Sequence, residues 1–95
     1  MSAKADLLRA RRTRWIHGPG SIELLVARPR ALEIAQWSAD GNAGIALRCV
    51  IDWRGVTWGD VSGDGDATPQ PFDADIRDEW LPDRPDLLVS VWETI

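Results

Sequence analysis

The hydrophobic and polar positions at the start of the chain predict a polar arm followed by a β-hairpin. Residues 1–12 are rich in helix formers but carry only one small apolar cluster, which predicts a basic helical arm that frays rather than packs. Two apolar runs follow, Trp15-Ile16 and residues 22–26, and turn residues at 17–20 separate them. That pattern is typical of two antiparallel strands joined by a turn.

Two short helices are expected after the hairpin. Pro29 offers a fixed φ for a first helical position, and Asp40-Gly41-Asn42 ends that helix. Asn42 can cap the second helix. Its apolar side chains recur at i, i+3, i+4 and i+7, on Ala46, Cys49, Val50 and Trp53. This spacing predicts that Trp53 belongs to the core at the end of a helix.

The chain beyond this helix alternates between turn residues and apolar residues. Gly55 lets the backbone turn, residues 56–58 are expected to be a short extended piece, and residues 59–71 form an acidic, solvated loop. Asp73 or Asp75 can cap the next helix, which Pro82 ends.

Pro85 starts the last expected helix, in which an apolar stripe repeats at i, i+3, i+4 and i+7 on Leu88, Val91, Trp92 and Ile95. Trp53, Trp80 and Trp92 are therefore expected in the core. The predicted fold class is α+β, with an N-terminal β-hairpin packed on three or four short α-helices in a single small domain over residues 13–95.

Charge is distributed unevenly along the chain. Residues 1–30 hold seven basic residues against two acidic ones, a net charge of +5, whereas residues 31–95 hold four arginines against thirteen carboxylates, a net of −9. This asymmetry predicts an arm that either seeks an acidic surface elsewhere or folds back on its own acidic half. We favour the second alternative.

No catalytic, cofactor or metal site emerges from the residues. Asp60, Asp64 and Asp66 stand close together, but they do not supply the ligand offsets of a calcium loop. Cys49 lies on the apolar stripe while His17 lies in the hairpin turn, so a buried, inert thiol is expected. No other signal indicates an enzyme.

The lone cysteine implies no internal disulfide and no oxidising compartment. No signal peptide is visible, and the longest apolar stretch is too short to span a bilayer. A protein of the cytoplasm, without membrane contact, is therefore expected.

Nucleic-acid binding is the strongest alternative derived from the residues alone. Arginines at 9, 11, 12 and 14 precede Trp15, and arginine can pair with phosphates while tryptophan stacks on bases. The acidic balance of the whole chain, with a pI of about 4.8, opposes this alternative.

The order of several motifs resembles the small tail assembly chaperones of long-tailed bacteriophages and prophages. The motifs are Val-Ala-Arg-Pro at 26–29, Val-Ile-Asp-Trp-Arg-Gly-Val at 50–56, Pro-Phe-Asp-Ala-Asp at 71–75 and Pro-Asp-Leu at 85–87. The likeness covers most of the chain after Arg12. The chain departs from the pattern at Arg30, where a threonine is usual, and in its longer, more acidic loop.

The resemblance implies a non-enzymatic helper that binds the tape-measure protein, shields its apolar helices and brings tail-tube subunits to it in the cytoplasm of the bacterial host. One alternative is a structural tail or head-tail subunit retained in the virion. A second is a nucleic-acid-binding accessory protein that uses the basic N-terminal arm. The residues nominated for partner contact are Arg9, Arg11, Arg12, Arg14, Val56 and Trp58.

Overall fold

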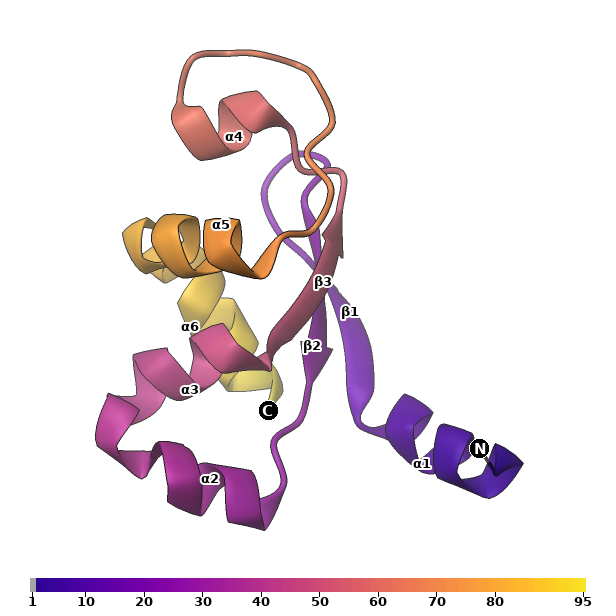
Figure 1. Cartoon of the computed structure of the whole chain (residues 1–95). Coiled ribbons are helices and arrows are strands. Elements are labelled where there is room, and N and C mark those ends of the chain that lie inside the picture. The colour runs from indigo at the N-terminus through magenta and orange to yellow at the C-terminus, as the bar shows by residue number, and fades with distance from the viewer. Residues whose placement is uncertain (1) are drawn as a thin grey trace.

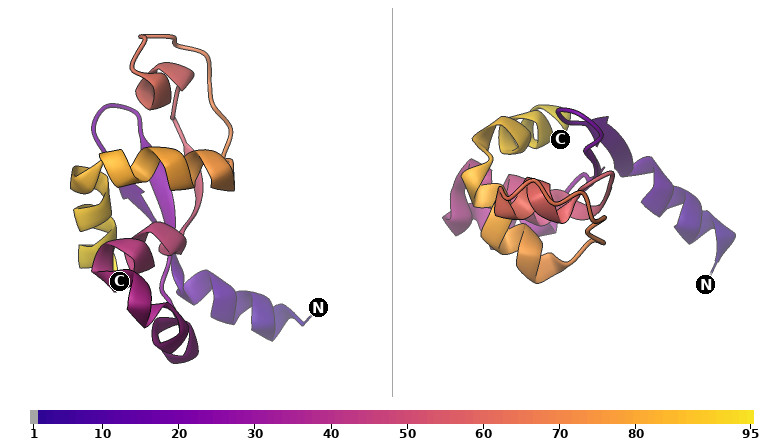
Figure 2. Two further views of the ribbon diagram at one scale, coloured as in Figure 1. Left: turned by 60° about the vertical axis from the view of Figure 1, so that its left-hand side comes forward. Right: turned by 90° about the horizontal axis from the view of Figure 1, so that it is seen from above.

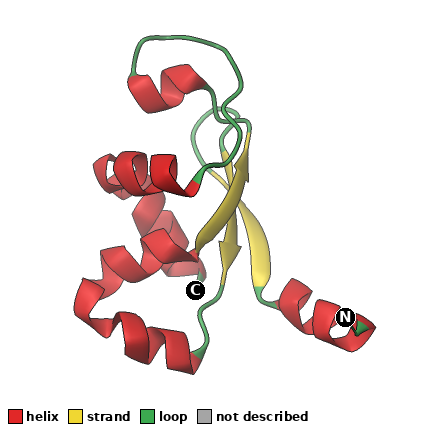
Figure 3. Ribbon diagram, in the orientation of Figure 1, coloured by secondary structure: helices red, strands yellow, loops and turns green. Residues whose placement is uncertain are grey.

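A computed structural model describes residues 2–95 and shows an α+β fold. A three-stranded antiparallel sheet in the order β1-β2-β3 is covered on one side by helices (Figures 1 and 3). The strands are β1 (Thr13–His17), β2 (Glu23–Ala27) and β3 (Val50–Arg54). The helices are α1 (Ala3–Arg11), α2 (Ala31–Trp37), α3 (Gly41–Cys49), α4 (Trp58–Ser62), α5 (Ala74–Trp80) and α6 (Pro85–Thr94), with short 3-10 turns at Ser38–Asp40 and Leu81–Asp83.

The predicted hairpin is confirmed. β1 pairs with β2 in a register that sets Arg14 opposite Val26 and Trp15 opposite Leu25. Leu24 and Val26 are buried whereas their neighbours are only half-buried, as the alternation of side chains along a strand requires. The helix-facing side of β2 therefore forms the floor of the core.

The third strand corrects the prediction that a helix extends to Trp53. α3 ends at Cys49, and β3 begins at the next residue and pairs with β2. The register shifts between Leu25 and Val26, so that Trp53 lies opposite Leu24 while Val50 lies opposite Val26. Because of this β-bulge, Val50 and Trp53 lie on the same face of the strand although they are three residues apart. In the sequence, that spacing resembles the spacing of a helix.

The α2 and α3 region differs from the prediction in its boundaries. α2 begins at Ala31 rather than at Pro29, and the backbone N–H of Arg30 donates to the Glu33 carboxylate at 3.0 Å. α3 begins at Gly41, with Asp40 rather than Asn42 at the N-cap. Asp40 instead accepts a hydrogen bond from Arg48 at 2.9 Å across the same helix. Both helices exist, but α2 starts two residues after its predicted first residue and α3 starts before its predicted cap.

The expected extended piece at 56–58 and the loop at 59–71 contain the short helix α4. Thr57 caps it, since its hydroxyl accepts from the backbone N–H of Asp60 while the Asp60 carboxylate accepts from the N–H of Thr57. Two backbone hydrogen bonds order the rest of the loop. The N–H of Trp58 donates to the carbonyl oxygen of Thr68, and the N–H of Gly59 donates to that of Asp66. Local capping chemistry thus orders a segment whose composition indicates only a solvated loop.

The last two helices agree with the sequence in their boundaries. Asp73 caps α5 by accepting from the N–H groups of residues 75 and 76, and Pro85 is the first residue of α6. The buried side chains of α6 are Leu87, Leu88 and Val91. Trp92 is 41% exposed, so its predicted place in the core is wrong. The face of α6 that is buried carries Leu87, Leu88 and Val91 and leaves Trp92 at its edge.

The arm does not fold back on the acidic half of the chain. Within residues 2–12, the ion pair of Arg9 is made with Asp6 of the same helix at 2.7 Å. Figure 2 shows α1 leaving the sheet and projecting away from the other helices in both views. None of its residues is buried. Met1, which the predicted arm includes, lies outside the described residues.

Trp53 lies at the centre of the core and joins three segments of the chain. Its ring packs edge-on against Phe72 and Trp80, at centroid distances of 4.8 and 5.5 Å. The indole N–H donates to the carbonyl oxygen of Gln70 at 2.8 Å. β3, the segment after the acidic loop and α5 therefore share one aromatic cluster.

Replacing Gly55 with alanine should destabilise the fold strongly. Gly55 has φ +69°, and a Cβ there would lie 1.8 Å from the carbonyl oxygen of Ser21. We expect a loss of about 3 kcal/mol or more in the free energy of unfolding, measured with urea. Gly63→Ala is the matched control, because Gly63 also has positive φ but open space around it. It should cost about 1 to 2 kcal/mol. Equal losses for the two variants would contradict the steric argument.

Candidate functional site: an arginine hollow beside an apolar groove

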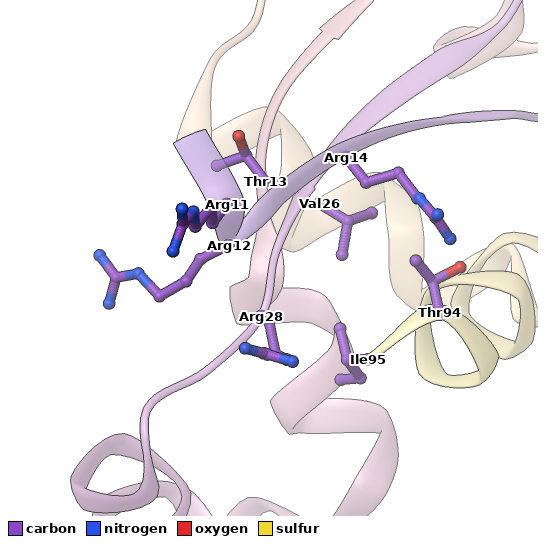
Figure 4. Close-up of a pocket in the computed structure, with 8 residues that line it drawn as sticks. All are labelled: Arg11, Arg12, Thr13, Arg14, Val26, Arg28, Thr94 and Ile95. Carbon is purple, nitrogen blue, oxygen red and sulfur yellow. The ribbon is translucent and has the colours of Figure 1, made fainter. Parts of the chain in front are cut away.

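Four arginines surround a hollow of about 380 Å³ at the end of the hairpin. Arg11 ends α1, Arg12 and Arg14 flank the start of β1, and Arg28 follows β2. Figure 4 shows Arg14 extending above Thr94 and Arg28 lying beside Ile95, while Arg11 and Arg12 lie on the α1 side. We call this set of four side chains the arginine hollow.

The hairpin register brings two of these arginines together. Pairing continues one step beyond β1 and β2, because the backbone N–H of Arg28 donates to the carbonyl oxygen of Arg12. Arg12 and Arg28 are thus opposite each other across the strands. Like charges placed directly opposite are unfavourable, so this arrangement does not serve to stabilise the hairpin.

The four arginines of the hollow differ from the other six arginines of the described chain because they have no carboxylate partner. Six arginines lie within 4.0 Å of a carboxylate, namely Arg9, Arg30, Arg48, Arg54, Arg77 and Arg84. Among residues 2–95, the four arginines of the hollow form no such pair and no side-chain hydrogen bond is found for them. Their guanidinium donors therefore remain available to a bound anion.

A pocket of about 330 Å³ lined mainly by apolar side chains adjoins the arginine hollow. Its walls come from Pro29 after β2, Ile34 on α2, Ile45 on α3 and Trp92 on α6. We call it the apolar groove. It shares Arg28 and Ile95 with the arginine hollow, so the two form one continuous surface.

Trp58 lies on a different surface. It is 40% exposed and lines a third pocket with Val61, Ile76 and Trp80, rimmed by Asp75, Glu79 and Asp83. That pocket shares no residue with the arginine hollow or the apolar groove. Trp58 is therefore a separate candidate contact.

The structure brings together three of the six nominated contact residues, Arg11, Arg12 and Arg14. Arg9 pairs with Asp6 and lines a neighbouring depression. Val56 is only 2% exposed and belongs to the core, so its nomination as a partner contact is wrong. Its side chain turns inward because it follows the left-handed Gly55 at the end of β3.

Sequence reasoning missed Arg28 and the apolar groove. The position of Arg28 could have been found by extending the hairpin register one step past Thr13 and Ala27, which sets it opposite Arg12. The groove has no such signal, because its walls come from three helices and a loop that only tertiary packing brings together.

The three loop aspartates are occupied by local structure. Asp60 closes the cap of α4, Asp64 accepts from the N–H of residue 66, and Asp66 accepts from both the N–H and the hydroxyl of Thr68. The bonds from Thr68 lower the pKa of Asp66. Across the described residues, no three His, Cys, Asp or Glu side chains gather into a possible metal site.

Cys49 and His17 do not meet. Cys49 lies in the core with 2% of its surface exposed, whereas the His17 side chain is 81% exposed and lies 3.5 Å from Glu23. Burial, with a smaller contribution from Glu33, raises the pKa of the Cys49 thiol to about 11. The thiol is therefore protonated near neutral pH and is a poor nucleophile.

None of the helices in residues 2–95 is long and apolar enough to cross a membrane. No family model, curated protein or solved structure matches the chain.

The Cys49 thiol should resist labelling in the folded protein. At pH 8 we expect Ellman's reagent to react slowly in buffer and at once in urea, because unfolding restores an ordinary thiol pKa. Stability should also fall as the pH rises from about 9 toward 11, since only the unfolded state ionises the thiol in that range. Cys49→Ala should reduce this alkaline loss. Fast labelling of the native protein would contradict the burial of Cys49.

Removing two arginines of the hollow should leave the fold intact. Arg14→Gln with Arg28→Gln breaks no ion pair, so the free energy of unfolding should change by less than about 0.5 kcal/mol or increase slightly. Arg54→Gln is the matched control, because Arg54 bonds Glu23 at 3.0 Å and lies 4.0 Å over the ring of Trp15. It should lower the melting temperature. A larger loss in the double variant than in the control would show that the hollow has a structural role.

Proposed function

We propose that this protein is a non-enzymatic binding module that acts as a tail assembly chaperone of a long-tailed bacteriophage or prophage. In this role it covers apolar helices of the tape-measure protein and brings tail-tube subunits to them in the cytoplasm of the bacterial host. The tail proteins are named as partners on the strength of the sequence resemblance. The proposed binding surface is the apolar groove.

The observation that carries the proposal is the apolar groove. Trp92 is 41% exposed at its edge, and the apolar side chains of Ile34 and Ile45 line its walls. Tryptophan is enriched at the centres of protein interfaces, and one that lies beside other apolar side chains in a groove is a candidate anchor for a partner. A groove between helices can accept the apolar face of a partner helix.

The position of the groove suits reversible binding. α2 forms one wall and has no fully buried residue, and Trp37 at its end packs only partly against the core, so its first turns are the less constrained side of the groove. The opposite wall belongs to α6, which is anchored by Leu87, Leu88 and Val91. A firm wall and an adjustable wall allow the groove to cover similar apolar helices in succession.

A structural subunit retained in the virion is a second candidate, and the projecting arm favours it. α1 leaves the body of the molecule with Leu7 and Leu8 both more than 60% exposed. A helix of nine residues is marginal by itself in water, and a neighbouring subunit could supply the missing contacts.

Co-expression with the proteins of the neighbouring reading frames tests the chaperone proposal. A long, helix-rich partner that is insoluble alone should become soluble and co-purify with this protein. Trp92→Gln should weaken retention by roughly thirtyfold, the effect of losing a central interface tryptophan. Trp58→Gln and Val89→Gln are matched controls, because both side chains are exposed and neither lines the groove.

Two outcomes would count against the proposal. If Trp58→Gln releases the partner while Trp92→Gln retains it, the contact lies on the Trp58 surface instead of the groove. If purified phage particles contain this protein in many copies, the virion-subunit candidate replaces the chaperone.

A further inference from the structure

The arginine hollow is the feature that an apolar groove alone does not explain. We propose that it binds carboxylates of the same partner segment, so that the partner is an acidic amphipathic helix with its apolar side chains in the groove and its acidic side chains in the hollow. This inference rests on the proposed function and specifies the chemistry of the bound segment.

Charged side chains are paired unevenly over the described residues. The chain carries fifteen acidic residues against eleven basic ones, and six arginines of the described residues each meet a carboxylate. The four unpaired arginines are the four that share one hollow. Because none of these four is among the arginines that pair with a carboxylate, an anion that contacts them displaces no ion pair of the described chain.

The hydrogen-bond donors of the hollow are suited to carboxylates. Guanidinium groups donate paired hydrogen bonds that match the two oxygens of a carboxylate. The Thr94 hydroxyl at the rim already donates to the carbonyl oxygen of Ser90 at 2.9 Å. The arginines are thus the main donors facing the hollow, and they favour an anionic ligand over a neutral one.

The surroundings of the hollow favour a protein segment over a nucleic acid. The hollow continues through Arg28 and Ile95 into the apolar groove, which offers almost no donors to a phosphate backbone. The rest of the domain is acidic, with a net charge of −9 over residues 31–95, and repels a polyanion that extends past the hollow. A helix with apolar and acidic residues on adjacent turns fits both surfaces at once.

The test uses two synthetic peptides and the full chain. Each peptide has about 18 residues, with leucines at i, i+3, i+4 and i+7 at one end of the helix. The first carries glutamates on the same face at the other end, and the second carries glutamines there. Fluorescence polarisation of labelled peptides measures both affinities at low salt.

We expect the glutamate peptide to bind at least tenfold more tightly than the glutamine peptide, with a difference that shrinks as salt increases. Arg12→Gln with Arg14→Gln should reduce this difference severalfold without weakening the glutamine peptide, because neither residue lines the apolar groove. Trp92→Gln should weaken both peptides, because it removes a contact that they share.

The possible results separate the two proposals. Equal affinity for the two peptides would overturn the inference while leaving the apolar groove as the binding site. If neither peptide binds, the groove and the hollow both fail as a site for an amphipathic helix. If single-stranded DNA binds more tightly than the glutamate peptide and the double variant abolishes that binding, the hollow is a phosphate site and the inference is overturned.

Discussion

The structure depends on the packing of Trp53. Its ring lies between Phe72 and Trp80, and its N–H is bonded to the backbone of Gln70. This contact fastens β3 to α5 and holds the two ends of the acidic loop near each other. α6 follows α5 after a single 3-10 turn and packs against α3, which sets the position of Trp92 beside the groove. A small domain can rely on a few large rings in this way because each buries a large apolar area.

Much of the fold could be predicted from local chemistry. The hairpin follows from two apolar runs around turn residues, and Asp73 and Pro85 mark the starts of α5 and α6 where the structure has them. β3 could not be predicted in the same way, because the bulge sets Val50 and Trp53 on one face and imitates a helix. α4 could not be predicted from composition, because its residues are mostly turn formers and a capping box of Thr57 and Asp60 orders them.

The candidate site was only partly visible in the sequence. The arginines at 11, 12 and 14 stand out as a basic cluster, but their lack of carboxylate partners is a property of the folded chain. Val56 and Trp58 are separated by one residue, yet one is buried and the other exposed, because the chain turns at Gly55 and enters α4 at Trp58. The groove depends on contacts among α2, α3 and α6, which no local pattern encodes.

We propose that the groove and the arginine hollow together form the surface for a partner helix. Hydrogen–deuterium exchange of this protein, alone and in complex with the partner recovered by co-expression, tests that claim directly. We expect slower exchange in α2, in the last turn of α6 and in the backbone around Arg12 and Arg28, with little change in α4 and α5. Protection confined to α4 and α5, around Trp58, would contradict it.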